Sequence, residues 1–361
     1  MRVSRLRLRN FRNYGRLDLE LGPGLNVFLG PNAQGKTNLL ESVALAALST
    51  SPRARRESEL IGPLGGEARV EAGVEGAGGG HVVAISIRSD GERARRTIRV
   101  DGAPRRAVDL PGLLTAVLFW PEDLSLVKSG PEHRRRLLNE TLVQVEAGHA
   151  RDLAGYRRVL EQRNSLLKQV AAGRRPPQDL DVWDAELAST GERIARSRGA
   201  AVEELEPLAA ATHAAVSGGE ELRLRYQGPP QDLLEAVQNS RAEDLGRGTT
   251  STGPHRDDVA VTLGGREARG YSSQGQQRTA VVSLKLAEAA LIEARTGTPP
   301  VLLLDDVLSE LDGPRRAALL ERVGSGGQVV ITSVEGSPFP EAVMAGAAVR
   351  CISAGEVTAC G

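Results

Sequence analysis

The sequence predicts an α/β protein in which a helical lobe interrupts a sheet domain. An apolar strand at 25–29 leads into a glycine-rich loop and an apolar helix at about 37–48, an order typical of α/β folds. Between 131 and 208, apolar residues recur every three or four positions, which indicates long helices. A continuous apolar run at 301–304 indicates a strand buried in a parallel sheet. The chain is therefore expected to return to the sheet after the helical stretch.

The N-terminal part alternates between apolar and polar residues. This pattern covers 3–9 and 16–21, with a turn at 13–15 between them, and it predicts a hairpin with one buried face. Two further strands are expected at 81–87 and 96–100, because these segments are rich in β-branched residues and flank a Ser-Asp-Gly turn.

The middle of the chain predicts two long antiparallel helices. The first is expected from Pro131 to about Ala171, where a Gly-Arg-Arg-Pro-Pro segment follows, and the second extends to Leu208. Forty helical residues span about 60 Å, so the lobe is short compared with a long coiled-coil arm. Later elements are a helix at 317–323 and a buried strand at 328–333. The expected division is 1–120 and 248–361 for the sheet domain and 121–247 for the helical lobe.

Composition excludes several classes of protein. The 361 residues carry 46 basic and 46 acidic side chains, so the net charge indicates no polyanionic or membrane partner by itself. Aromatic residues make up 3%, too few for a stacking platform for single-stranded nucleic acid. The two cysteines, Cys351 and Cys360, do not make a disulfide framework or a zinc site. With no signal-like or membrane-spanning apolar stretch, we expect a soluble, cytoplasmic protein without a membrane partner.

The glycine-rich loop matches the phosphate-binding pattern G-x-x-x-x-G-K-[ST] in full. It consists of Gly30, Pro31, Asn32, Ala33, Gln34, Gly35, Lys36 and Thr37. The two glycines let successive N–H groups turn toward phosphate oxygens, and the helix that begins here adds its positive dipole end. Lys36 is expected to reach the β- and γ-phosphates, and the Thr37 hydroxyl to ligate Mg²⁺. With Asn38, these residues form the predicted ATP site.

The apolar run at 301–304 ends in two acids. Asp305 stands at the carboxyl end of the predicted strand, where Mg²⁺ is held in nucleotide-binding sheets. Asp306 follows it and is expected to orient or deprotonate the attacking water. We therefore predict Thr37 and Asp305 as metal ligands and Asp306 and Lys36 as catalytic residues.

A turn rich in Ser, Gln and Gly lies about 30 residues before this strand and opens a helix that runs to about Leu291. The N-terminus of a helix is a second arrangement that binds phosphate. The pattern alone is weak, because polar turns are common, but its place just before the Asp-Asp strand makes it specific. The predicted phosphate contacts are Ser273, Gln274, Gly275 and Gln276.

Together these motifs resemble those of the ABC-type ATPases, in which a signature loop precedes the Walker B strand. The resemblance implies that the signature loop of one subunit caps the ATP held by the phosphate-binding loop of another, so the enzyme is a dimer with two ATPs between its heads. The segment Ser309-Glu310-Leu311-Asp312 resembles the D-loop of that family, which crosses the dimer interface.

Three further segments resemble the RecF family of recombination mediators, which is related to the SMC-type heads. They are 8–14 (LRNFRNY), 120–136 (with WPEDL, Lys128 and RRR) and 253–258 (GPHRDD). The resemblance covers the whole chain. It implies an ATP-dependent homodimer that clamps double-stranded DNA near gaps and helps RecR and RecO load RecA, in DNA replication, DNA repair and the SOS response to DNA damage.

Two departures from the general ABC pattern bear on turnover. The acid after the Walker B aspartate is usually Glu, whereas Asp306 is one methylene shorter, and the strand ending at Ser333 lacks the usual switch His. We therefore expect slow ATP hydrolysis that times a clamp. No clear Q-loop glutamine is present, and Glu122 is a poor substitute.

The sequence offers several arginine clusters for DNA. Of these we favour Arg53, Arg55 and Arg56, because a segment after the loop's helix can lie near the dimer cleft. Another cluster crowds the N-terminal hairpin, and a third lies between Arg93 and Arg106. Each can equally be a solvated charged face. His255 is either an ordinary turn residue or has a role at the nucleotide or DNA face.

Two other functional classes also use a phosphate-binding loop. An ATP-hydrolysing subunit of an ABC transporter would be shorter, with a Q-loop and a switch His. A P-loop GTPase would need an N-K-x-D base reader, and the sequence has none. The helical insertion and the missing His favour the DNA clamp over both.

Overall fold

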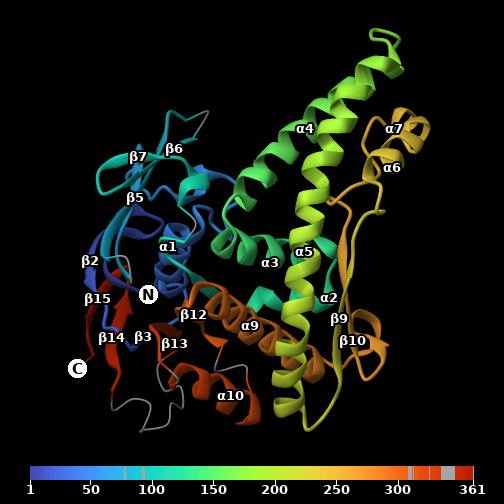
Figure 1. The fold of residues 1–361 in the computed structure, drawn as a ribbon. Helices are drawn as coiled ribbons and strands as arrows, with labels where there is room; N and C mark the ends of the chain where they lie inside the picture. Colours follow the sequence, from blue (N-terminus) through green and yellow to red (C-terminus); the bar gives the residue numbers. More distant parts are fainter. Residues whose placement is uncertain are drawn as a thin grey trace.

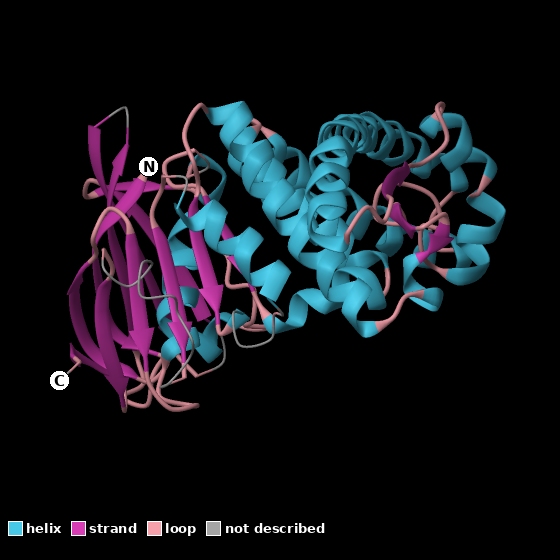
Figure 2. Cartoon of the chain, turned by 90° about the horizontal axis from the view of Figure 1, so that it is seen from below, coloured by secondary structure: helices cyan, strands magenta, loops and turns pink. Residues whose placement is uncertain are grey.

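The computed structural model describes residues 1–76, 79–91, 94–110, 112–307, 311, 313–324, 326–334 and 346–360. Strands gather at one end of the molecule and helices at the other (Figure 1, Figure 2). The predicted fold class, α/β with a helical lobe inserted in mid-chain, is confirmed. None of the helices in the described ranges combines the length and apolar character needed to cross a membrane.

An antiparallel sheet forms the outer layer. Its strands are β1 (Arg2–Phe11), β2 (Tyr14–Glu20), β4 (Glu67–Gly76), β5 (Gly79–Ser89), β6 (Ala94–Val100) and β7 (Ala103–Arg105), in the order β2-β1-β4-β5-β6-β7. The alternation in β1 and β2 places Leu6, Leu8, Leu17 and Leu19 on the buried face and charged residues on the other. The predicted hairpin is confirmed, but the turn predicted at 13–15 lies at 12–13, because Tyr14 already pairs with Phe11 as the first residue of β2.

A mixed sheet forms the second layer. It contains β3 (Leu25–Leu29), β8 (Ala116–Phe119), β12 (Val301–Asp305), β13 (Val329–Ser333), β14 (Ala348–Ser353) and β15 (Glu356–Ala359), in the order β15-β14-β3-β13-β12-β8. All neighbours pair in parallel except β14 and β15. β12 and β13 are buried along their whole length, as their continuous apolar sequences predict. A disulfide joins Cys351 and Cys360 across the last hairpin.

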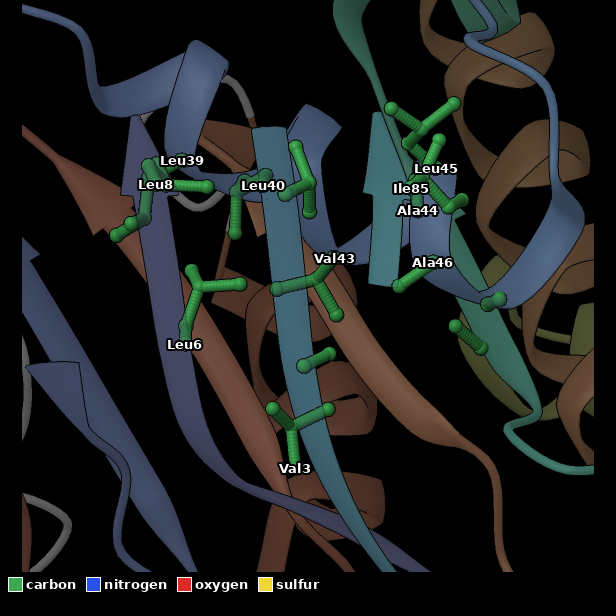
Figure 3. Close-up of a cluster of buried hydrophobic side chains, with 14 of the residues drawn as sticks. Val3, Leu6, Leu8, Leu39, Leu40, Val43, Ala44, Leu45, Ala46 and Ile85 are labelled. Atoms are coloured by element: carbon green, nitrogen blue, oxygen red, sulfur yellow. The ribbon is translucent and has the colours of Figure 1, made fainter. Parts of the chain in front are cut away.

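Helix α1 (Lys36–Leu48) lies between the two sheets. From Leu39 to Leu48 every residue is buried, so the helix shows no polar face. Leu39, Leu40 and Val43 point toward Leu6 and Leu8 of β1 (Figure 3). This apolar packing holds the start of α1, and with it the glycine-rich loop, against β1.

The helical lobe follows the edge strand β8. It comprises α2 (Ser125–Lys128), α3 (Pro131–Val145), α4 (His149–Ala171), α5 (Leu180–Ser217), α6 (Leu233–Asn239), α7 (Arg241–Arg247) and the short 3-10 turns η3 (Pro121–Leu124) and η4 (Pro177–Asp179). Helices α4 and α5 form the predicted antiparallel hairpin (Figure 1). The prediction of one helix from Pro131 to Ala171 is wrong. The chain breaks between Val145 and His149, because Gly148 adopts a φ of 100°, which ends one helix and begins another.

A small sheet completes the lobe, with β9 (Leu222–Gln227), β10 (Asp258–Leu263) and β11 (Arg266–Glu267) in the order β11-β10-β9. β10 pairs with β9, so contacts of the lobe continue beyond residue 247. The division at 120/121 and 247/248 stays a prediction. The chain then passes through α8 (Ala268–Tyr271) and α9 (Gln274–Thr296) to β12, and α10 (Gly313–Gly324) precedes β13. Two further 3-10 turns are η1 (Glu57–Leu60) and η2 (Ala107–Asp109).

Candidate nucleotide-binding site

The glycine-rich loop joins β3 to α1 at the carboxyl end of the mixed sheet, where ligands bind in parallel α/β sheets. Gly30 and Gly35 have φ values of 157° and 111°, and Ala33 has a φ of 64°. A Cβ on Gly30 would lie 2.3 Å from the Ile352 carbonyl oxygen, and one on Gly35 would lie 2.6 Å from the Asn13 amide. Both glycines are therefore required by their protein neighbours as well as by the curl of the loop.

Neighbouring turns hold the loop from outside. The Tyr14 hydroxyl donates to the Gly35 carbonyl at 2.9 Å, and the Asn13 amide donates to the Gln34 carbonyl at 2.9 Å. From the β14–β15 turn, the backbone N–H of Ala354 donates to Gln34 Oε1 at 2.7 Å. Sequence reasoning assigned Asn13 and Tyr14 to a hairpin turn and missed this supporting role. Only the three-dimensional approach of the hairpin to the loop reveals it.

Lys36 turns back onto its own loop. Its ammonium donates to the carbonyls of Gly30 and Pro31, the latter at 2.9 Å, and its side chain is buried. Burial lowers the pKa of Lys36, and the charges of Asp306 and Asp305 oppose that effect. The ammonium thus donates to carbonyls of its own loop, and it lies beside the space where the phosphates of a nucleotide are expected.

The predicted metal ligands meet at one point. Thr37 Oγ1 donates to Asp305 Oδ2 at 2.7 Å, and Thr332 Oγ1 donates to Asp305 Oδ1 at 2.7 Å. Burial raises the pKa of the Asp305 carboxyl, while the two threonine hydroxyls and Arg53 favour its ionised form. A hydroxyl and a carboxylate are oxygen donors, which suit Mg²⁺ when phosphate oxygens complete its shell. No cluster of three His, Cys, Asp or Glu side chains that could hold a metal occurs in the described ranges.

A pocket of about 360 Å³ opens over these groups. It is lined by Asn32, Ala33, Gly35, Lys36, Thr37, Asn38, Arg53, Pro121, Asp305 and Asp306. Asp306 sits in a left-handed conformation with a φ of 52°, which Asp tolerates better than most residues. The structure thus brings the predicted loop, metal and catalytic residues together. Gly30, Pro31 and Gln34 belong to the loop but do not line the pocket.

A second groove of about 540 Å³ adjoins the pocket. The two share Asn38 and Arg53, and the groove also has walls from Arg12, Ile61 and Pro63. Its place beside the phosphate-binding loop gives room for the nucleoside end of a nucleotide.

Arg53 belongs to the nucleotide pocket. Its guanidinium donates to Asn38 Oδ1 at 3.2 Å, lies 3.5 Å from the buried Glu41 carboxylate, and sits 6.0 Å from the centre of the Trp120 ring. The sequence predicts Arg53 as a DNA contact, and the structure places it at the edge of the nucleotide pocket; the DNA contact stays a prediction. The other two members of that cluster, Arg55 and Arg56, are exposed.

The predicted signature residues lie elsewhere. Ser273 is the N-cap of α9: its hydroxyl accepts from the N–H of Gln276, and the Gln276 side chain accepts from the N–H of Ser273. Gly275 adjoins Arg315, which donates to its carbonyl at 2.8 Å. None of the residues Ser273, Gln274, Gly275 and Gln276 lines the pocket over Lys36. One chain therefore presents the two predicted halves of a site apart from each other.

Two other predictions have different outcomes. Of the predicted D-loop, Ser309, Glu310 and Asp312 lie outside the described residues. His255 is packed inside the helical lobe, where its ring nitrogens contact the Tyr156 hydroxyl at 2.7 Å and the Thr250 carbonyl at 3.0 Å. The reading of His255 as a turn residue fits these contacts, and a nucleotide role does not.

The fold and this site define an ABC-type ATPase head. A family model described as the RecF/RecN/SMC N terminal domain matches residues 2–352. The chain is 42% identical to the DNA replication and repair protein RecF of Synechococcus sp. (strain JA-3-3Ab), covering 98% of this chain and 96% of that one. It is also 42% identical to the protein of the same name from Roseiflexus castenholzii, covering 93% and 94%. The chain belongs to the RecF family.

Solved structures agree with this assignment. The structure described as the recombination mediator protein RecF-ATP in the RecFOR pathway superposes with a TM-score of 0.91 at 31% identity, covering 99% of this chain and 97% of that one. An SMC head bound to the C-winged helix domain of ScpA reaches a TM-score of 0.56 at 16% identity, which shows a shared fold alone. The resemblance inferred from the sequence is confirmed at the level of family and fold.

Proposed function

We propose that this chain is an ATP-dependent, DNA-binding recombination mediator. Two copies close around two ATP molecules, the dimer clamps double-stranded DNA near gaps, and the clamp helps RecR and RecO load RecA. Slow ATP hydrolysis then releases it. The proposal agrees with the relatives, which are DNA replication and repair proteins, and with the solved structure of the recombination mediator protein RecF-ATP.

One observation carries the dimer proposal. The phosphate-binding half is complete on one chain, with Lys36, Thr37 and Asp305 around one pocket, whereas the N-capped start of α9 contributes nothing to that pocket. A helix N-terminus with Ser and Gly at its first turn suits a phosphate oxygen. A second copy can bring Ser273 to the open side of the pocket, so the bound nucleotide holds both copies.

The roles of the residues follow from their positions. The loop N–H groups and Lys36 bind the phosphates, and Arg53 and Asn38 contact the nucleotide beside them. Thr37 and Asp305 would hold Mg²⁺, which supplies charge neutralisation for phosphoryl transfer when bound. Asp306 orients the attacking water with a side chain one methylene shorter than the Glu usual in ABC-type ATPases, which supports slow turnover. Arg55 and Arg56 remain proposed DNA contacts. No observation favours a transporter subunit.

The test compares oligomeric states with ATP and duplex DNA. Light scattering coupled to gel filtration should show a dimer for the unmodified chain and a monomer for Lys36→Met, because the variant loses the charge-assisted contacts to phosphate, worth about 1.5–3 kcal/mol each. Lys168→Met is the matched control, since Lys168 is exposed on α4. An unmodified chain that stays monomeric with ATP and DNA would contradict the clamp.

A further inference from the structure

The outer face of the antiparallel sheet carries charges in two contrasting rows. Along one row, strand partners place Asp18, Arg7 and Glu71 side by side on β2, β1 and β4, so charges alternate. Their distances confirm the pairing: Arg7 Nη1 lies 3.0 Å from Glu71 Oε1 and its Nε lies 3.3 Å from Asp18 Oδ2. The charges of this row are satisfied within the sheet.

The next row along the same strands contains three arginines. Arg16, Arg9 and Arg69 are direct partners on β2, β1 and β4, and all three are exposed. Like charges directly opposite one another destabilise a sheet. Arg69 has Glu71 at 2.8 Å, but within the described ranges no carboxylate lies within 4 Å of Arg9 or Arg16.

The arginine row lines an open groove of about 600 Å³. The charged residues on its walls are Arg7, Arg9, Arg16 and Arg69 against Asp18 and Glu71. The row continues across the sheet as hydroxyl groups, because Arg69 is opposite Ser86 and Ser86 is opposite Thr97. The Ser86 hydroxyl already hydrogen-bonds to Glu67, so the arginines are the part of the row that is complementary to a line of anionic oxygens.

We infer that Arg16, Arg9 and Arg69 form a binding surface for the phosphate backbone of double-stranded DNA, separate from the surface near Arg55 and Arg56. The inference rests on the proposed DNA-binding function and deepens it. Adjacent strands are about 4.8 Å apart, so the three arginines span about 10 Å. At about 3.4 Å of axial rise, that length corresponds to about three nucleotides of one DNA strand, and because the backbone winds around the axis, about two of their phosphates face the surface. Bound phosphates also relieve the repulsion among the arginines.

The surface has a structural link to the nucleotide. The turn between β1 and β2 contains Asn13, and Tyr14 is the first residue of β2, two residues from Arg16; the side chains of both residues donate to the phosphate-binding loop. DNA on the arginine row therefore sits on the same hairpin that supports the loop holding ATP.

The test uses a fluorescent duplex of random sequence and the full chain with ATP. Binding is measured by anisotropy across a series of salt concentrations for the unmodified chain, the double variant Arg9→Gln/Arg16→Gln, and the control Arg5→Gln/Arg88→Gln. The control removes the same charge from the same face, but Arg5 and Arg88 already pair with Asp18 and Glu67. For each lost phosphate contact the slope of log affinity against log salt becomes shallower by about 0.9, so the double variant should lose about 1.8.

Each outcome decides one question. A shallower slope for Arg9→Gln/Arg16→Gln alone, with ATP binding and melting temperature unchanged, supports the surface. A slope equal to that of the unmodified chain overturns it and leaves the row to an acidic protein partner, while the proposed DNA clamp stands. An unmodified chain that fails to bind duplex DNA at any salt concentration removes the proposed function itself, and the surface with it.

Discussion

Two regions of this protein are rich in charge and use it in opposite ways. At the nucleotide pocket, Lys36, Arg53 and Asp305 face a shared open space. Backbone carbonyls hold Lys36 and threonine hydroxyls hold Asp305, whereas the side chains of Asn38 and Glu41 hold Arg53. Inside the helical lobe, Arg163 is fully buried between Asp184 and Asp244. Charge facing a pocket is available to a ligand, whereas charge enclosed by its counter-ions holds the architecture together. The chemistry of a charged residue thus depends on what surrounds it.

The buried cluster connects four segments of the lobe. Arg163 on α4 donates to Asp184 on α5 at 2.6 Å, to Asp244 on α7 at 2.7 Å, and to the Thr250 hydroxyl at 2.7 Å. Arg241 shares Asp184 at 2.6 Å. The network therefore fixes the α4–α5 hairpin to the segment that leads into β10.

The largest expected effect is the loss of this network. Arg163→Met leaves two buried carboxylates without their common partner, which should lower the free energy of unfolding by about 3–5 kcal/mol. Thermal or urea denaturation measures it, and Arg157→Met on the same helix is the control, since Arg157 is exposed and its ion pair with Glu161 is also exposed. The folded variant should still bind ATP. A stability loss no larger than that of the control would show that the lobe does not depend on this charge.

The same contrast explains what the sequence could and could not predict. The phosphate-binding loop, Asp305 and the buried strands are specified by residues close together in the sequence. Their spacing therefore predicts them. The approach of Tyr14 to Gly35 and the position of Arg53 over Trp120 depend on contacts between distant segments, and no local pattern encodes them.

The break between α3 and α4 could be predicted only in part from the sequence, and the buried ion network could not be predicted. Gly148 is a visible signal for a helix break, because glycine in a helix interior is unfavourable by about 1 kcal/mol, but the apolar periodicity on both sides favoured one continuous helix. The ion network of Arg163 was hidden completely. The sequence alone does not distinguish an arginine that is buried from one that is exposed to solvent. The folded structure is needed to tell them apart.

A smaller effect on stability, with a separate effect on assembly, is expected at the start of α9. Ser273→Ala removes the N-cap hydroxyl that accepts from Gln276, which should lower stability by about 1 kcal/mol. The control is Asp232→Ala, which removes the N-cap acceptor of α6 inside the lobe. Both variants should melt at similarly reduced temperatures. Only Ser273→Ala should also reduce ATP-dependent dimerisation, as judged by light scattering, while the monomer binds ATP normally. Equal dimerisation of the two variants would remove Ser273 from the shared site.

The last effect is expected at a third group of charges, at the junction of α3 with α9 and η3. Glu140 on α3 lies near Arg136 of the same helix, Lys285 and Glu288 of α9, and Asp123 of η3. Burial raises the pKa of Glu140 to about 7, against the attraction of Arg136 and Lys285, while the carboxyls of Glu288 and Asp123 raise it further. The folded protein then binds a proton more tightly than the unfolded chain, so this group lowers stability as pH rises from about 4.5 to about 7.

Glu140→Gln should therefore remove a pH-dependent penalty at the junction. We expect the variant to be more stable than the unmodified chain at pH 8, by about 1 kcal/mol, because the exposed quarter of the side chain screens the full effect of the pKa shift. At pH 5 the difference should nearly vanish. Melting curves at the two pH values measure it, and Glu161→Gln, an exposed glutamate on α4, should show no such dependence. A penalty that is the same at both pH values would mean that Glu140 stays ionised throughout, and the junction would then be a fully paired cluster like that of Arg163.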